Sequence, residues 1–480
     1  MENLGFISII PVLITLVIAV WTRNVILGLF IGVFTGVMIL YGLNPFTGMS
    51  TLIEKYIIVQ VTSSSHTGIL ILMVLIGGVV GLMERSGGAV AFASMVVKYI
   101  SSKVKAQLAA WTSGSLLFFT DSGTPLIVGP LFRPIVDGIK ISRVKLAWII
   151  DSTASPVAVL IPFIGWGLYS QGLIAQEYAE LGLTENAFSV YVKAVPFQFY
   201  SLMAVMMVPM VAMLKADFGP MKKAEANCAK GIVLEDENTK ISEGVSDDII
   251  KKAKPVLVWL PLLIMLVVMF GLLVPLGFPF DMSNIPGNAF RSALSTAYIF
   301  ALYIKSIGVI VNILIILILA WSLGAIGKDL GAAAYIVALA DGSFPPSLIP
   351  LVAFLVGAII SFSTGSSWGT YAILMPLIIP MAHQFDAPMY VSIGAVLSGG
   401  LFGDHCSPIS DTTILSATGA GCTQIDHVKT QLPYALFNGS CCIVAFVFAG
   451  ITGSVWGLAI GAALMFAGLL VISKLNRVKS

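Results

Sequence analysis

Residues 403–413 read Gly-Asp-His-Cys-Ser-Pro-Ile-Ser-Asp-Thr-Thr, a polar run inside a chain that is otherwise mostly apolar. Because an unpaired polar group costs several kcal/mol in hydrocarbon, we expect this run to line a cavity inside the protein. Pro408 has no amide hydrogen and clashes with the preceding turn, so a helix crossing here is broken and its carbonyl groups are freed. Carbonyl, carboxylate and hydroxyl oxygens are the hard ligands that suit Na⁺. The run therefore predicts a cation site.

Three other polar segments interrupt apolar stretches. One breaks a predicted span, and the other two lie between apolar arms that are too short to cross a bilayer alone, so each pair of arms predicts a re-entrant hairpin with a buried polar tip. The broken spans are expected at about 145–168, interrupted at Asp151-Ser-Thr-Ala-Ser-Pro156, and at about 388–425; the hairpins are expected at about 106–131, with its tip at 119–125, and at 348–380, with its tip at 363–370.

Four carboxylates lie in these segments, Asp121, Asp151, Asp404 and Asp411, and His405 is the basic side chain among them. Such a site favours a cation, although amide groups at helix amino termini could still hold an anionic group. Burying a carboxylate in a membrane costs about 2.5 kcal/mol or more, so we expect these residues to couple cations and protons. Two alternatives stay open. Asp121 could instead cap a helix, and His405 could either titrate and carry a proton or bond to a neighbouring carbonyl.

The hydroxyl side chains of the same segments are candidate ligands for the substrate or ion. Serines and threonines in apolar helices usually bond to their own backbone, but this alternative weakens where the helix is broken. We expect Na⁺ to bind between Thr124 and Ser155, and between Thr370 and Ser407, since each tip faces the broken span of its own half. The candidate substrate- or ion-binding residues are Thr120, Ser122, Thr124, Ser152, Thr153, Ser155, Ser363, Thr364, Ser366, Ser367, Thr370, Ser407, Ser410 and Thr412.

The composition indicates an integral membrane protein. The chain has 480 residues, of which 58% are hydrophobic and 10% charged, whereas soluble domains carry about 25% charged residues. The lipid bilayer is thus a partner, and a net charge of +2 without a basic patch gives no sign of nucleic-acid binding. The five cysteines are odd in number and show no metal-ligand spacing, so we expect no disulfide framework.

Two halves of the chain repeat the same order of elements. Thr124 and Pro130 recur as Thr370 and Pro376 at an offset of 246, and Ser155-Pro156 recurs as Ser407-Pro408 at 252. The fold class is therefore an all-α integral membrane protein of two inverted repeats with about eleven transmembrane helices, two re-entrant hairpins and two broken helices. We divide the chain into a first repeat at 1–214, a linker at 215–254, a second repeat at 255–450 and an extra span with a tail at 451–480.

The remaining spans are expected outside the hairpins and broken helices. They lie at about 5–22, 24–43 and 66–83, at 194–214, at 256–276, 287–304 and 307–327, and at 433–450 and 453–473, with a short interfacial segment at 88–104. The linker holds eight lysines and eight acidic residues, so its charge balances.

Basic residues set the expected orientation. Arg133, Lys140, Arg143 and Lys145 lie in one short loop, and Lys474, Arg477 and Lys479 lie at the end. The positive-inside rule then places the linker and carboxyl terminus in the cytoplasm and the amino terminus outside the cell membrane. His66, His383 and His427 lie near expected span ends, so we expect them to be solvated.

At this point the motifs resemble a known family. The run from Gly403 to Gly419, followed by Asp426-His427 and Gln431-Leu-Pro-Tyr434, is similar to the signature of the NhaC family of Na⁺/H⁺ antiporters. Leu319-Ala-Trp-Ser-Leu-Gly324 and Ser366-Ser-Trp-Gly-Thr370 resemble its second-half motifs. The resemblance covers the chain apart from the linker. It implies the ion-transporter superfamily fold, in which a scaffold domain, often a homodimer, holds a transport domain of two hairpins and two broken helices that moves as a body.

The resemblance also implies coupling to Na⁺ without a cofactor, with Asp151, Asp404 and Asp411 as ion or proton carriers. It leaves two substrates open. The first is Na⁺/H⁺ antiport, and the second is Na⁺- or H⁺-coupled transport of a small organic acid or amino acid. A channel is disfavoured because paired broken helices imply alternating access. An enzyme is disfavoured because no G-x-S-x-G or H-E-x-x-H pattern accompanies the polar residues.

Overall fold

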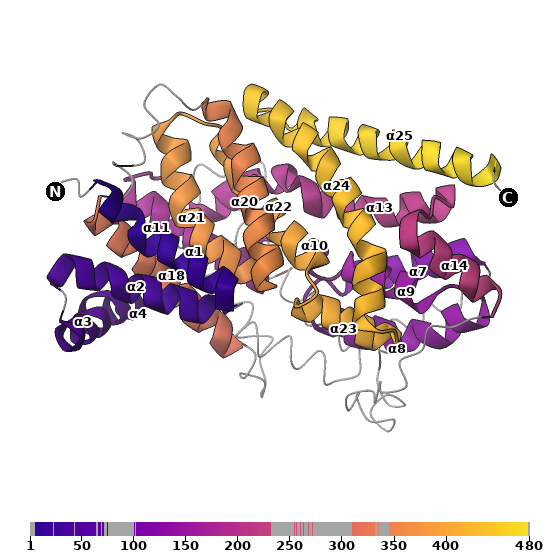
Figure 1. Ribbon diagram of the computed structural model, residues 1–480, viewed down its shortest axis with the longest axis horizontal. Coiled ribbons are helices and arrows are strands. Elements are labelled where there is room, and N and C mark those ends of the chain that lie inside the picture. Colours follow the sequence, from indigo (N-terminus) through magenta and orange to yellow (C-terminus); the bar gives the residue numbers. More distant parts are fainter. Residues whose placement is uncertain are drawn as a thin grey trace.

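The computed structural model is a bundle of helices (Figure 1). It describes residues 5–22, 24–42, 44–63, 102–231, 310–331 and 345–478, with isolated positions between them. The expected spans at 256–276 and 287–304, most of the span at 66–83, most of the interfacial segment at 88–104 and the later part of the linker lie outside the described residues.

Every regular element among the described residues is a helix. The α-helices are α1 Ile10–Thr22, α2 Val25–Tyr41, α3 Pro45–Thr51, α4 Ile58–Thr62, α7 Lys103–Leu116, α8 Gly123–Gly138, α9 Arg143–Asp151, α10 Ser155–Ala158, α11 Gly165–Glu180, α12 Ala187–Ala194, α13 Phe199–Leu214, α14 Gly219–Ala229, α18 Ile310–Asp329, α20 Ile349–Thr364, α21 Ser367–Gln384, α22 Met389–Cys406, α23 Asp411–Ala420, α24 Gln424–Thr452 and α25 Trp456–Val478.

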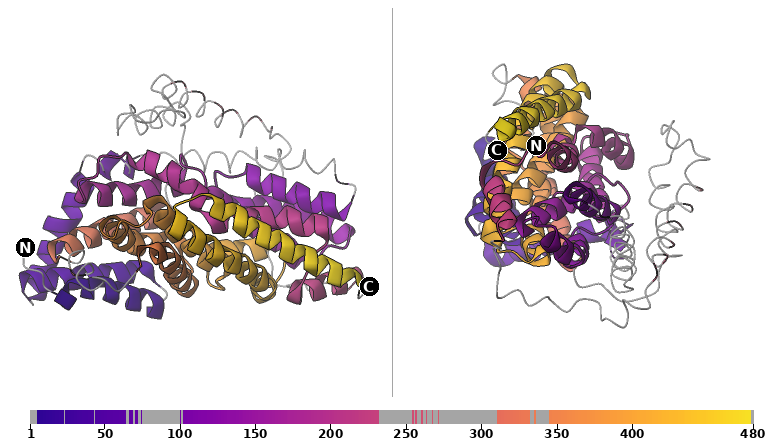
Figure 2. Two further views of the ribbon diagram at one scale, coloured as in Figure 1. Left: turned by 90° about the horizontal axis from the view of Figure 1, so that it is seen from above. Right: turned by 90° about the vertical axis from the view of Figure 1, so that its right-hand side faces the viewer.

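The bundle is elongated. Helices α1 to α4 lie at one end, and α7, α8, α9 and α14 lie at the other, with α20, α21 and α22 between them (Figures 1 and 2). Helix α25 runs along one side toward the carboxyl terminus. Four helical stretches are long and apolar enough to cross a membrane, and two bent pairs raise the number to six among the described residues.

Two helix–turn–helix pairs stand at the expected hairpin positions. Helix α7 turns into α8 through residues 117–122, and α20 turns into α21 through Gly365 and Ser366. Gly365 has φ 66°, in the left-handed region that glycine adopts without a Cβ penalty. Ser366 then caps α21, because its hydroxyl accepts the amide of Gly369 at 3.3 Å. Local chemistry thus accounts for the second turn.

Both expected helix breaks are present. Helix α9 ends at Asp151 and α10 begins at Ser155, while α22 ends at Cys406 and α23 begins at Asp411. Pro156 directly follows Ser155, and Pro408 directly follows Ser407. Neither proline has an amide hydrogen, so neither can continue the hydrogen bonds of the preceding helix. Each break therefore leaves backbone groups that other elements must satisfy.

The first broken span differs from the expectation that it continues to residue 168. The chain breaks a second time at residues 159–164, and α11 begins only at Gly165. Pro162 cannot continue a helix, and side chains take up the freed carbonyls. The Tyr191 hydroxyl donates to Val159 O, and Gln171 Nε2 donates to Pro162 O at 2.5 Å.

The start of the expected linker is a packed helix. Lys145 of α9 is 2% exposed and lies 2.7 Å from a carboxylate oxygen of Asp217. The Tyr434 hydroxyl donates to the same carboxylate at 3.0 Å, and Glu225 of α14 accepts hydrogen bonds from the amide and hydroxyl of Ser142. Residues 215–229 therefore fasten α9 to α24 rather than forming a free connector.

Candidate functional site

The first hairpin tip is bound to α11 through Asp121. One carboxylate oxygen accepts the Ser122 amide at 2.8 Å and its hydroxyl at 3.2 Å. The other oxygen accepts the indole N–H of Trp166 at 2.9 Å. Trp166 is 4% exposed and lies near the start of α11, where the sequence analysis expected the end of the first broken span. Asp121 thus binds the amide at the start of α8 and also reaches a second element.

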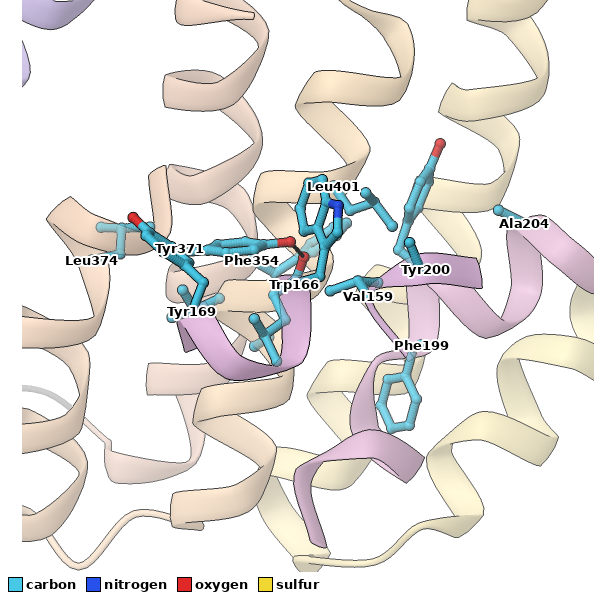
Figure 3. Close-up of a cluster of buried hydrophobic side chains, with 14 of the residues drawn as sticks. Val159, Trp166, Tyr169, Phe199, Tyr200, Ala204, Phe354, Tyr371, Leu374 and Leu401 are labelled. Carbon is cyan, nitrogen blue, oxygen red and sulfur yellow. Dashed lines mark hydrogen bonds between the residues drawn. The ribbon is translucent and has the colours of Figure 1, made fainter. Parts of the chain in front are cut away.

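The second hairpin tip meets the same helix. The rings of Trp166 and Trp368 lie 4.3 Å apart, and the Tyr169 hydroxyl donates to Trp368 O at 2.6 Å. Figure 3 shows Trp166 and Tyr169 on α11 beside Tyr371 of α21. Since Trp166 contacts Asp121 and Trp368 at once, α11 brings the two tips together.

The two tip threonines have matching geometry. Thr124 Oγ1 donates to Thr120 O at 2.8 Å, and Thr370 Oγ1 donates to Ser366 O at 2.8 Å. Both threonines are fully buried. A hydroxyl that donates its hydrogen keeps its oxygen lone pairs, so each oxygen could still bind a cation.

The carboxylate of Asp151 is 1% exposed and is held by the second half of the chain. Its Oδ2 accepts Gln431 Nε2 at 2.6 Å and Thr413 Oγ1 at 3.3 Å, and His427 Nε2 lies 3.3 Å away. Gln431 also donates to the carbonyl of His405. Two hydrogen-bond donors and the ring of His427 thus meet at one oxygen of Asp151.

His405 extends this network toward α13. Its Nε2 lies 3.2 Å from Ser152 Oγ, and its Nδ1 lies 2.8 Å from the hydroxyl of Tyr200. Both ring nitrogens of this buried histidine are therefore occupied. Both partners of the ring are hydroxyl groups, so the alternative in which His405 bonds to a neighbouring carbonyl is wrong.

Asp404 lies in a different environment from Asp151. It is 3% exposed, and the side chains of Ser410 and Ser367 are its uncharged polar neighbours. Its strongest charged neighbour is Asp411, which in turn interacts electrostatically with Asp121. Asp411 is exposed, and its Oδ1 accepts the Thr412 amide at 2.9 Å. Electrostatic interactions thus link the four carboxylates of the polar segments, which we call the acidic chain.

The two serines before the breaking prolines differ. Ser407 Oγ donates to Phe362 O at 2.7 Å, which ties the second break to α20. Ser155 Oγ is buried and has no hydrogen-bond partner among the described residues. Ser155 is thus the candidate ligand whose oxygen is free of protein bonds.

Other predicted hydroxyls bond mainly within their own segments. Thr153 donates to Ile149 O at 3.0 Å although it lies in a break, so the expectation that broken segments weaken this bonding is wrong there. Four of the remaining predicted hydroxyls form local bonds or are partly exposed: Thr120 Oγ1 accepts the Gly123 amide, Thr364 donates to Ile360 O, Ser410 contacts Thr412, and Ser363 is half-buried. Ser367 of α21 instead donates to Gly400 O of α22 at 3.2 Å.

Two functional candidates were missed by the sequence analysis. His427 was expected to be solvated, but it is fully buried against Asp151, and Gln431 lies one helical turn further on the same face of α24. His66 is also buried, stacked on Trp321 at 3.8 Å, while His383 is exposed as expected. In the described part of the chain, no three His, Cys, Asp or Glu side chains gather as a metal-binding group.

Comparisons with known proteins agree with these features. The model of the Na⁺/H⁺ antiporter family matches residues 157–451. An uncharacterized protein of Haemophilus influenzae is 30% identical over 494 aligned residues, covering 97% of this chain and 94% of that protein. The malate-2H⁺/Na⁺-lactate antiporter of Bacillus subtilis is 32% identical over 116 residues, or 24% of this chain and 23% of that protein.

A solved structure shares the fold. The YdaH transporter of Alcanivorax borkumensis superposes with a TM-score of 0.56 at 16% identity, covering 86% of this chain and 90% of that chain. The described helices therefore have the fold of an all-helical, multi-pass integral membrane protein.

Proposed function

Because the chain belongs to the Na⁺/H⁺ antiporter family, and is thus a secondary transporter and not an enzyme, we propose that it exchanges Na⁺ for H⁺ across the cell membrane. One observation carries this proposal. The four carboxylates of the polar segments interact electrostatically with one another, and none of them forms an ion pair with a Lys or Arg among the described residues. They are Asp121, Asp151, Asp404 and Asp411. Asp151 and Asp404 are buried. A buried negative charge without a lysine or arginine partner is costly, and a bound cation or proton removes the cost.

Asp404 is our proposed cation-coupling carboxylate. It is buried among hydroxyls, and its charged neighbours Asp411 and Asp151 are also acidic. Asp151 is instead surrounded by protein donors, so we assign it to proton coupling and not to Na⁺ binding. His405 orients Ser152 beside it.

For Na⁺ itself we propose one site in each half. The first lies between Thr124 and Ser155, and the buried, unpartnered hydroxyl of Ser155 supports it. The second lies between Thr370 and Ser407, and the equal geometry of Thr124 and Thr370 supports the pairing. In this proposal Na⁺ is the transported substrate, held by oxygen atoms.

The wider architecture is part of the same proposal. Two inverted repeats, at 1–214 and 255–450, are joined by a cytoplasmic linker, and about eleven spans place the amino terminus outside and the carboxyl terminus inside the cell. The hairpins and broken helices would move as one transport domain against a dimeric scaffold. The matching helix breaks before Pro156 and Pro408 support the repeat.

The alternative substrate is a small organic acid or amino acid coupled to Na⁺ or H⁺. The similarity to a malate and lactate antiporter favours it, but that match covers 24% of this chain. The acidic chain of carboxylates favours a bare cation.

One assay separates the two. Purified protein in liposomes that contain a pH dye is given an inward Na⁺ gradient without any organic solute. We expect proton efflux that rises with Na⁺ and saturates. Proton flux that appears only after malate, lactate or an amino acid is added would replace antiport with the organic-solute carrier.

A further inference from the structure

His427 and Asp151 form a buried pair that joins the two halves of the chain. His427 is 0% exposed and Asp151 is 1% exposed, and the closest nitrogen and oxygen lie 3.3 Å apart. The histidine comes from α24 and the carboxylate from the end of α9. The sequence analysis expected His427 to be solvated, and the proposed exchange function does not use it.

The ring of His427 has capacity for one more proton. In the tautomer that donates Nε2–H to Asp151, the remaining Nδ1 is an acceptor, and this atom is buried without a hydrogen-bond partner among the described residues. His405 differs, because both of its ring nitrogens already contact hydroxyls. Of the two buried histidines beside Asp151 and Ser152, His427 is the one that contacts a carboxylate directly.

Asp151 is in turn held as a fixed counter-ion. Gln431 and Thr413 both donate to its Oδ2, and donated hydrogen bonds favour the ionised form of a carboxylate. A proton that reaches the pair is therefore better placed on imidazole nitrogen, where the adjacent carboxylate balances its charge, than on carboxylate oxygen, where it would oppose two donors.

We propose, resting on the exchange function above, that His427 carries the coupling proton, with Asp151 as its counter-ion and with Gln431 and Thr413 positioning that carboxylate. The step is proton uptake on the ring nitrogen from the side to which the site is open. The pair passes from a net charge of −1, with neutral imidazole, to a net charge of zero, with imidazolium. Release on the other side restores the neutral ring and the net charge of −1, while Asp151 stays ionised throughout.

The titratable groups that face this pair are few in the described part of the chain. Helix α22 contributes Asp404, His405 and Cys406, α23 contributes Asp411 and α13 contributes Tyr200. On its own helix, Asp426 is bonded to Thr423. The charged groups near the start of α9 are also engaged: Asp137 of α8 with Arg143, Asp217 before α14 with Lys145, and Glu225 of α14 with Ser142.

Two measurements test the proposal. The first is Na⁺-driven proton flux as a function of pH in liposomes. His427→Gln keeps an amide donor for Asp151 but cannot accept the proton. Any residual flux then depends on the carboxyl of Asp151, a more acidic type of group, so the pH of half-maximal flux should fall by about one unit or more. His383→Gln, at an exposed histidine, is the matched control and should behave as wild type.

A third variant decides which group holds the proton. If His427 carries it, Asp151 is ionised before and after uptake, so Thr413→Val leaves the pH midpoint within about 0.3 unit, whatever it does to the rate. If Asp151 carries it, losing a donor raises the midpoint by about one unit. That upward shift, or an unchanged midpoint in His427→Gln protein, overturns the proposal. This variant keeps side-chain volume, so the test survives if His427→Gln does not fold.

The second measurement does not need transport. The chain has four histidines, so the ¹⁵N imidazole signal of His427 is identified by its loss in His427→Gln. We expect this signal to titrate within the pH range of transport and to stop doing so in Asp151→Asn. A His427 ring that stays neutral while wild-type vesicles exchange Na⁺ for H⁺ overturns the assignment alone. A ring that titrates with Asp151 while vesicles show no Na⁺-driven flux overturns the antiport proposal alone.

Discussion

Gln431 Nε2 lies 2.6 Å from Oδ2 of Asp151, although 280 residues separate them in the chain. Gln431 also donates to the carbonyl of His405, so one amide connects the end of α9 to the last turn of α22. The two broken helices are thus fastened to each other through α24. A change of charge at Asp151 therefore acts directly on Gln431, which also binds the His405 carbonyl beside the second break.

We predict that Asp151→Asn and Asp404→Asn fail in different ways. Asp151→Asn should lower Na⁺-driven proton flux by roughly tenfold or more, or about 1.4 kcal/mol, and spare exchange of internal for external Na⁺. Asp404→Asn should lose Na⁺ exchange itself, because it removes the charge among the hydroxyls of Ser367 and Ser410. Tracer Na⁺ exchange and dye-reported proton flux in the same vesicles measure both. Equal loss of both activities in the two variants would contradict this division.

We predict that Thr124→Val and Thr370→Val each weaken the Na⁺ dependence. The substitution keeps volume and removes an oxygen, and the loss should raise the half-saturating Na⁺ concentration by roughly threefold to tenfold, or about 0.7 to 1.4 kcal/mol. Thr418→Val is the control, since Thr418 makes the same bond to its own helix, to Ile414 O at 2.9 Å, outside both tips. An unchanged Na⁺ response in both tip variants would exclude Na⁺ from these sites.

The breaks and turns could be predicted because their causes are local. Pro156 and Pro408 lack the amide hydrogen that the preceding turn would need, which favours a break, and Gly365 supplies the left-handed residue of a turn. The helix at Pro45–Thr51 carried a local signal that was overlooked, since Asn44 caps it and a proline opens it.

The contacts of the site could not be predicted so directly. Helix α11 was missed because Gln171, Gln176 and Glu177 interrupt its hydropathy, yet Gln176 Nε2 donates to Trp321 O at 2.7 Å in a distant helix. His427 and Gln431 stood in a recognisable motif at a spacing of four, which places both on one helix face. The spacing predicts the shared face, but only the fold shows that Asp151 is the partner of both residues.

We predict that Trp166→Phe weakens substrate interaction while keeping the stack on Trp368. The variant loses only the indole N–H that binds Asp121 at 2.9 Å. A hydrogen bond to a charged group contributes about 1.5–3 kcal/mol, so the half-saturating Na⁺ concentration should rise by tenfold or more if Asp121 orients the tip. Trp456→Phe, at a tryptophan that is 69% exposed on α25, is the control. Matching Na⁺ curves for the two variants would remove Asp121 from the cation site.

We predict that Asp217→Asn destabilises the fold through Lys145. The ammonium is buried and lies 2.8 and 2.7 Å from the two carboxylate oxygens, so the variant leaves it without a charged partner. Breaking a buried pair costs about 3–5 kcal/mol, and the partial exposure of Asp217 places the expected loss toward the lower end. Thermal unfolding in detergent measures it. Glu185→Gln, which breaks the more exposed pair with Lys193, should cost at most about 1 kcal/mol; equal melting temperatures would contradict the role of residues 215–229 as a fastening.

Helices α8 and α23 approach so closely at Gly129 and Gly419 that neither position admits a side chain. A Cβ added to Gly129 would lie 2.4 Å from the carbonyl carbon of Gly419, which is backbone and cannot rotate away. We therefore predict that Gly129→Ala forces the first hairpin away from the second broken helix, at a cost of about 1–3 kcal/mol. Gly138→Ala is the matched control, because it changes the same helix and its Cβ would meet nothing within 4 Å. Thermal unfolding and tracer Na⁺ exchange should both be impaired in Gly129→Ala and normal in Gly138→Ala. Normal exchange in a Gly129→Ala protein would mean that transport does not depend on this close packing of the two halves.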